Sequence, residues 1–61
     1  MNKEPKNIII EYVFNGQTRA TQLDPKDIAC RNRDNNFSIE RTMNLIAECY
    51  GDVIINIHFE Y

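Results

Sequence analysis

The chain lacks most of the residues and motifs from which the chemistry of a small protein is recognised. It has no tryptophan, one histidine, two cysteines, two glycines and two prolines in 61 residues. A structural zinc site uses about four Cys or His ligands at short spacings, so these residues are too few to build one. With so little glycine and proline, and with 43% hydrophobic residues, the composition is typical of a folded domain. We therefore expect a globular protein with no metal and no cofactor.

Long apolar runs and an excess of basic residues are also missing. No run approaches the ~20 apolar residues that span a bilayer, so we expect no membrane partner. The N-terminal segment MNKEPKN is charged and does not have the apolar core of a signal peptide, which favours a cytoplasmic location. The net charge is −2, whereas nucleic-acid-binding domains usually carry a basic surface, so nucleic acid is disfavoured as a partner.

The short length limits the stability of the fold. Residues 1–61 are expected to form one domain, in which residues 1–6 are flexible. A domain this small buries only ~60% of the surface of its unfolded chain. Such domains usually gain stability from disulfides, a metal or association. Without an export signal, Cys30 and Cys49 are expected to stay reduced. Association with a protein partner, or with a second copy as a homodimer, is therefore the expected source of extra stability.

The N-terminal part of the chain predicts a β-hairpin. Residues 7–14 (NIIIEYVF) have the alternation of a strand, and residues 17–23 (QTRATQL) form the return strand. Asn15-Gly16 between them favours a type I′ turn, which requires positive φ at both central residues. Because a two-residue loop fixes the register, the face of each strand follows from the turn. The face expected in the core consists of Ile8, Ile10, Tyr12, Phe14, Thr21 and Leu23.

Two helices are expected to follow the hairpin. Asp24-Pro25 predicts the start of a short helix, because Asp caps helices and Pro suits the first helical position. The segment 31–36 is polar and is expected to be a turn. Ser38 is expected to cap a longer helix over residues 39–50, which Gly51 ends. The apolar residues of this helix recur at helical spacing and are expected to face the core: Ile39, Met43, Leu45, Ile46, Cys49 and Tyr50.

A third strand is predicted over residues 53–61, with no proline and no sign of a bulge. Its expected core face consists of Val53, Ile55, Ile57, Phe59 and Tyr61. Its opposite face consists of Ile54, Asn56, His58 and Glu60. The most compact arrangement is an α+β fold, in which a three-stranded antiparallel sheet of order 2-1-3 has its helices on one face. The third strand then lies at an edge, and a long apolar edge invites pairing with another chain.

These features favour a non-enzymatic protein-interaction module that binds through its C-terminal strand or its open sheet face. Exposed faces that mix apolar and polar residues are typical of contact sites. The residues expected to form the contact are Ile9, Val13, Ala20, Ile54, Asn56, His58 and Glu60. Small α+β chains include bacterial and phage accessory proteins, some of them inhibitors. We expect such a role by analogy of size and architecture alone.

Acid–base catalysis has candidate residues in Glu11, His58 and Glu60. A histidine between carboxylates on adjacent strands is suitable for proton transfer. A flat sheet face, however, offers no pocket that excludes water. The chain also carries no nucleophile elbow, phosphate-binding glycine loop or HExxH sequence. We therefore expect neither an enzyme nor a small-molecule substrate.

An alternative hypothesis rests on the main local basic cluster, which consists of Arg31, Arg33 and Arg41. These side chains can contact phosphates or an acidic protein, which would make the chain a nucleic-acid-associated regulator. Phosphate contacts dominate nucleic-acid affinity and make it depend on salt. The acidic balance of the whole chain counts against this hypothesis.

The cysteine pattern gives a first prediction. We expect thiol titration of the unfolded protein, without reductant, to report two free thiols per chain, because Cys30 and Cys49 are the only cysteines and no export signal precedes them. The same titration after reduction is the control. A value of zero before reduction would show a disulfide and contradict the prediction.

Overall fold

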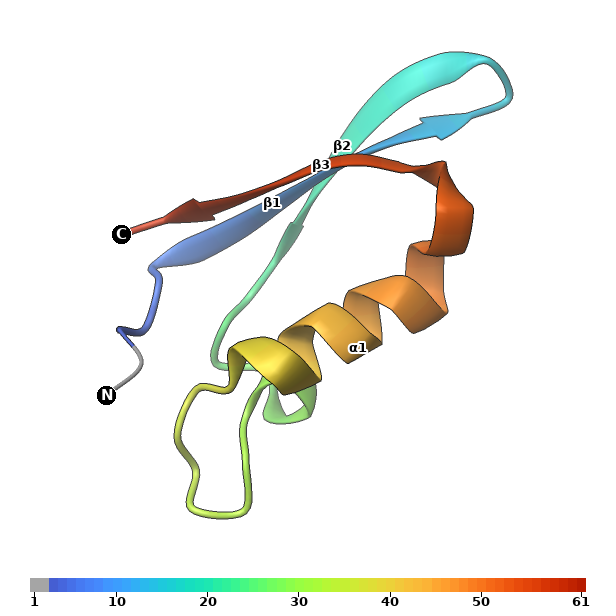
Figure 1. Ribbon diagram of the computed structural model, residues 1–61. Coiled ribbons are helices and arrows are strands. Elements are labelled where there is room, and N and C mark those ends of the chain that lie inside the picture. Colours follow the sequence, from blue (N-terminus) through green and yellow to red (C-terminus); the bar gives the residue numbers. More distant parts are fainter. Residues whose placement is uncertain (1–2) are drawn as a thin grey trace.

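The computed structural model describes residues 3–61 as a three-stranded antiparallel sheet with its helical segments on one face (Figure 1). The elements in chain order are β1 (Asn7–Phe14), β2 (Gln17–Leu23), the 3-10 turn η1 (Ile28–Cys30), α1 (Ile39–Tyr50), the 3-10 turn η2 (Gly51–Val53) and β3 (Ile54–Glu60). The strand order is β2-β1-β3. The expected α+β class and strand order are therefore confirmed. Within residues 3–61, no helix is long and apolar enough to cross a membrane.

The β1–β2 hairpin has the turn and register predicted for Asn15-Gly16. Both residues have positive φ, 52° at Asn15 and 74° at Gly16, as a type I′ turn requires. Phe14 pairs with Gln17 and the ladder continues to Ile8 and Leu23 without a shift. The turn alone thus decides which side chains of both strands face the helix.

The segment that follows β2 begins its helical turn later than expected. Asp24 accepts the Lys26 N–H at 2.9 Å through its carboxylate and the Asp27 N–H at 3.0 Å through its carbonyl oxygen. These bonds make a turn of the kind that Asp favours. Asp27 is the residue that caps η1, by accepting the Ala29 N–H at 2.9 Å. The expected start at Asp24-Pro25 is therefore wrong by three residues.

Helix α1 has the expected bounds and caps, but its buried side differs from the expected one. Ser38 accepts the Arg41 N–H at 3.3 Å, and Gly51 follows the helix with φ 58°. Thr42 and Ile46 are fully buried. The Thr42 hydroxyl donates to the Ser38 carbonyl oxygen at 2.8 Å, so burial leaves no unpaired polar group.

Three residues of the expected apolar stripe are exposed: Ile39 by 44%, Met43 by 42%, and also Cys49. The physical reason is that the core includes the loop before the helix. Phe37 is buried and pairs through a β-bridge with Arg31, beside buried Cys30. The helix turns its Thr42–Ile46 side toward this cluster. The expectation that Ile39, Met43 and Cys49 lie in the core is therefore wrong.

The molecule is thin and elongated, and its sheet is longer than its helical cover. The extents are 39 × 22 × 15 Å, and the hairpin turn projects past η2 (Figure 1). The buried hydrophobic residues are Ile8, Ile10, Cys30, Phe37 and Ile46. Tyr12 still packs on Tyr50, with ring centroids 4.9 Å apart. Phe14 and Tyr61, expected in the core, are each more than half exposed because they lie at opposite ends of the sheet.

Strand β3 contains a bulge that the sequence did not indicate. Glu11 pairs with Asn56, but Tyr12 pairs with Ile54, so Ile55 is an extra residue without a partner on β1. A bulge of this kind reverses the alternation of side chains on either side of it. Ile54 therefore packs against the core, and its predicted place on the outer sheet face is wrong. Ile55 is 55% exposed.

The segment before β1 makes specific contacts. Pro5 is buried, Glu4 forms an ion pair with Arg31 at 3.0 Å, and the Lys6 N–H donates to the Glu60 carbonyl oxygen at 2.6 Å. These contacts fall within the segment 1–6, which was expected to be flexible. Residues 1 and 2 of that segment lie outside the described residues.

The small core predicts a sharp contrast between two isoleucines. We expect Ile46→Ala to lower the free energy of unfolding by about 3 kcal/mol, because it leaves a cavity in a fully buried site. The matched control is Ile28→Ala, since Ile28 is 86% exposed and a surface change of this kind is worth at most about 0.5 kcal/mol. Urea denaturation followed by circular dichroism measures both values. Equal effects would contradict the observed position of α1.

Candidate interaction surface

The outer sheet face carries six of the seven residues that the sequence predicted as a contact. The register places Ile9 between Gln22 and His58, and Glu11 between Ala20 and Asn56. The predicted residues that share this face are Ile9, Val13, Ala20, Asn56, His58 and Glu60. Ile54 is the exception, because the bulge turns it inward.

Polar side chains bridge the strands of the outer face. Asn56 Nδ2 donates to Glu11 Oε1 at 3.0 Å, and Asn7 Nδ2 donates to Glu60 Oε1 at 3.3 Å. Ile9 is half-buried on this face, whereas Val13, at 38%, and Ala20 are exposed. The outer face is thus mixed, with apolar Ile9, Val13 and Ala20 among polar side chains that bridge the strands.

The candidate acid–base residues Glu11, His58 and Glu60 all lie on this outer face. The Glu11 carboxylate is bound by Asn56, and His58 is exposed on the sheet surface opposite Ile9. Within residues 3–61, no group of three or more His, Cys, Asp or Glu side chains is placed to hold a metal ion. The geometry on this face therefore supplies neither an enclosed site nor a paired proton donor and acceptor.

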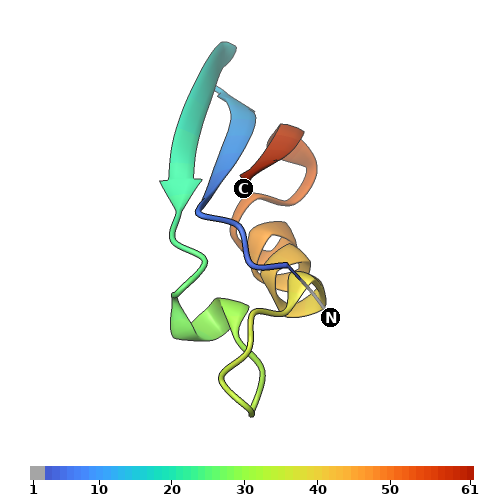
Figure 2. The same ribbon diagram turned by 90° about the vertical axis from the view of Figure 1, so that its left-hand side faces the viewer.

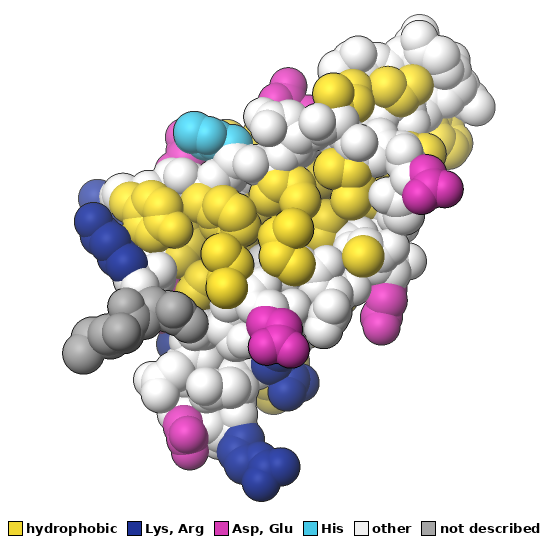
Figure 3. All heavy atoms as spheres, viewed as in Figure 1, with side chains coloured by type: hydrophobic (Ala, Val, Ile, Leu, Met, Phe, Trp, Pro, Cys, Tyr) yellow, Lys and Arg dark blue, Asp and Glu magenta, His cyan; other side chains and the backbone are white. Residues whose placement is uncertain are grey.

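Exposed apolar side chains concentrate between β3 and α1. Figure 3 shows a continuous band of hydrophobic side chains along this side of the molecule. We call it the apolar band and define it by residues Ile39, Met43, Ile55, Ile57, Phe59 and Tyr61. Four of them are more than two-fifths exposed, whereas Ile57 and Phe59 are half-buried against the core. The sequence identified all six as apolar but expected the core to cover them.

The two flanks of α1 face different parts of the molecule, and one of them contributes to the apolar band. Leu45 and Cys49 share a small hollow with Gln22 and Leu23, so this flank of α1 faces β2. Ile39 and Met43 lie on the opposite flank of the helix. Figure 2 shows the same asymmetry, with η1 beneath β2 and α1 displaced toward β3. The apolar side chains of α1 are therefore divided between a small hollow on the β2 side and the apolar band on the β3 side.

The backbone of β3 also faces outward on this side. Within residues 3–61, β3 pairs only with β1. The Glu60 carbonyl oxygen accepts from the Lys6 N–H, so the polar groups of Glu60 point toward β1. Because these groups alternate along a strand, those of Ile57 and Phe59 point toward the free edge. The same two residues thus present apolar side chains and unpaired backbone groups.

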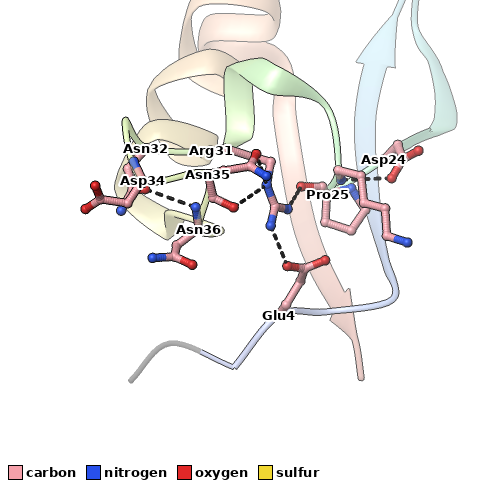
Figure 4. Close-up of polar contacts among 9 residues, drawn as sticks. Glu4, Asp24, Pro25, Arg31, Asn32, Asp34, Asn35 and Asn36 are labelled. Carbon is pink, nitrogen blue, oxygen red and sulfur yellow. Dashed lines mark hydrogen bonds and ion pairs between the residues drawn. The ribbon is translucent and has the colours of Figure 1, made fainter.

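The basic cluster is also brought together, but one of its members has a structural role. Figure 4 shows the Arg31 guanidinium enclosed by backbone and side-chain acceptors. Arg31 donates to the Pro25 carbonyl oxygen at 3.2 Å, to the Asn35 carbonyl oxygen at 3.0 Å and to Glu4 Oε1 at 3.0 Å. It ties the N-terminal segment to the loop before α1.

The three arginines line one open hollow of about 420 Å³, together with exposed Ile28. Because the donors of Arg31 are directed at Pro25, Asn35 and Glu4, the positive charge available to a phosphate there is mainly that of Arg33 and Arg41. Two exposed arginines on an acidic chain provide little electrostatic affinity for nucleic acid. The structure thus brings Arg31, Arg33 and Arg41 together, but the donors of Arg31 are already used within the chain.

Comparison with known proteins gives no match: no family model, no curated protein and no solved structure is significantly similar to this chain. The surface is therefore interpreted from its own geometry.

The contacts of Arg31 predict that it stabilises the fold. We expect Arg31→Ala to lower the free energy of unfolding by about 1–2 kcal/mol, because it removes hydrogen bonds to two carbonyl oxygens and a carboxylate. Arg33→Ala is the matched control, since Arg33 is exposed, and should change stability by at most about 0.5 kcal/mol. Urea denaturation measures both variants. A larger loss for Arg33→Ala would contradict the assignment.

Proposed function

We propose that the protein is a non-enzymatic binding module that associates with protein through the free edge of β3 and the apolar band beside it. The observation that carries this proposal is the double role of Ile57 and Phe59. Their backbone N–H and C=O groups point outward, and their side chains lie in the band. A partner strand placed at this edge would pair with these backbone groups and cover these side chains.

The size of the exposed surface supports the proposal. The chain exposes 4633 Å², whereas a compact monomer of this mass exposes ~4,100 Å². The radius of gyration is 11.9 Å, compared with ~10.5 Å for a compact domain of this length. One helix on a three-stranded sheet leaves apolar surface that a partner would remove from water, at about 25 cal/mol for each Å².

Strand addition is the binding mode that fits this surface. In that mode, backbone hydrogen bonds provide affinity and alternate side chains provide specificity. Non-covalent binding of this kind suits the accessory or inhibitory role expected from the size and fold of the chain. The proposed place of action is the cytoplasm.

The test separates this surface from the outer sheet face. We expect Met43→Lys and Ile55→Lys to weaken binding at least tenfold, a change of about 1.4 kcal/mol, because each places a charge in the apolar band. Val13→Lys is the control, since Val13 is comparably exposed but lies on the outer face. The measurement is quantitative affinity capture from the native host, with second copies of the chain scored alongside other proteins. Circular dichroism confirms that each variant is folded.

Retention of every captured protein by both band variants would contradict the proposal. Loss of binding in Val13→Lys alone would contradict it as well, because it would assign the contact to the outer sheet face.

A further inference from the structure

We infer that the partner at the β3 edge is a second copy of this chain, joined through two antiparallel β3 strands about a two-fold axis. The inference rests on the proposed function and names its partner. The product is a continuous six-stranded sheet in which the two copies of β3 are central and both copies of α1 lie on the same face.

The β3 edge is complementary to itself in its hydrogen bonding. Antiparallel pairing joins residues whose backbone groups both point toward the neighbouring strand. Ile57 and Phe59 provide such groups in each copy, so two copies supply equal numbers of donors and acceptors. A two-fold axis also makes the interface close on itself, which leaves no further edge of the same kind exposed.

Side-chain pairing across the two strands favours one register. When Phe59 lies opposite Phe59 of the second copy, Ile57 lies opposite Tyr61, and His58 lies opposite Glu60 twice. A histidine opposite a carboxylate can donate a hydrogen bond to it across the two strands, whereas identical groups face each other if His58 lies on the axis. Glu60 Oε1 accepts from Asn7, which leaves Oε2 for the second copy. The only charged or chargeable side chains of β3 are thus paired with each other.

The apolar band is continued across the same axis. Ile39 and Met43 lie on the flank of α1 that faces away from β2, so in the dimer the bands of the two copies lie next to each other beneath the joined strands. The chain exposes ~500 Å² more than a compact monomer of its mass. A standard interface buries ~800 Å² on each partner. The chain therefore has surface in excess of a compact monomer, some of which pairing at this edge would bury.

The oligomeric state provides the first test. Light scattering across a dilution series should give twice the mass of the 7.2 kDa chain at high concentration. Met43→Lys should raise the dissociation constant at least tenfold, and Val13→Lys should leave it unchanged within about twofold. A dimer that resists Met43→Lys but is lost in Val13→Lys would overturn the inference in favour of contact through the outer sheet faces.

Disulfide trapping tests the register. The background is Cys49→Ser, which removes the exposed native thiol. His58→Cys and Glu60→Cys change exposed residues of the outer face. In the inferred register they face each other as a non-hydrogen-bonded pair with Cα atoms ~4.5 Å apart, within the range of disulfides. A mixture of the two variants should form a mixed disulfide dimer much faster than either variant alone. Rapid cross-linking of His58→Cys with itself would overturn this register.

The outcome also separates this inference from the proposed function. A protein that is monomeric at every concentration, but captures a different protein in a manner sensitive to Met43→Lys, overturns the second copy as the partner and leaves the binding module intact. A monomer whose captured proteins are unaffected by Met43→Lys and Ile55→Lys overturns both.

Discussion

Strand β1 pairs with a strand on each side, and the positions of the other elements depend on it. Its residues Ile8 and Ile10 are fully buried, so the strand is held on both edges and on its covered face. The turn at Asn15-Gly16 sets the register with β2, and the antiparallel ladder to β3 places the C-terminal strand. A slip of one residue in β1 would exchange the core face with the outer face across the whole sheet.

The second constraint is the amount of helix. The sheet is covered by one helix of 12 residues and a short 3-10 turn. The longest extent of the molecule is 39 Å. The turn η1 lies beneath β2 and α1 is displaced toward β3, yet Ile39 and Met43 on the outer flank of α1 remain exposed. The apolar band is therefore the apolar surface that this limited helical cover leaves exposed between β3 and α1.

The two candidate surfaces differ in how their polar groups are satisfied. On the outer face, Asn56 donates to the Glu11 carboxylate and Asn7 donates to the Glu60 carboxylate, so each carboxylate has a partner within the chain. At the β3 edge, the outward backbone groups of Ile57 and Phe59 have only water or another chain to pair with in the described part of the molecule. A desolvated backbone group without a partner is costly, which makes strand pairing a strong constraint on whatever covers this edge.

The sequence by itself determined the strands, the helix and the hairpin register, because Asn-Gly turns, Ser and Gly caps and residue periodicity act through neighbouring atoms. It also identified an apolar third strand at an edge. The rotation of α1, the bulge at Ile55 and the burial of Phe37 and Thr42 were decided only by tertiary structure. Periodicity shows which residues of a helix share a side, but the angle at which that side meets the sheet depends on packing with residues distant in the chain. For the same reason, the sequence left the contact open between the C-terminal strand and the outer sheet face, and it did not show that Ile39, Met43 and Ile55 are exposed between β3 and α1.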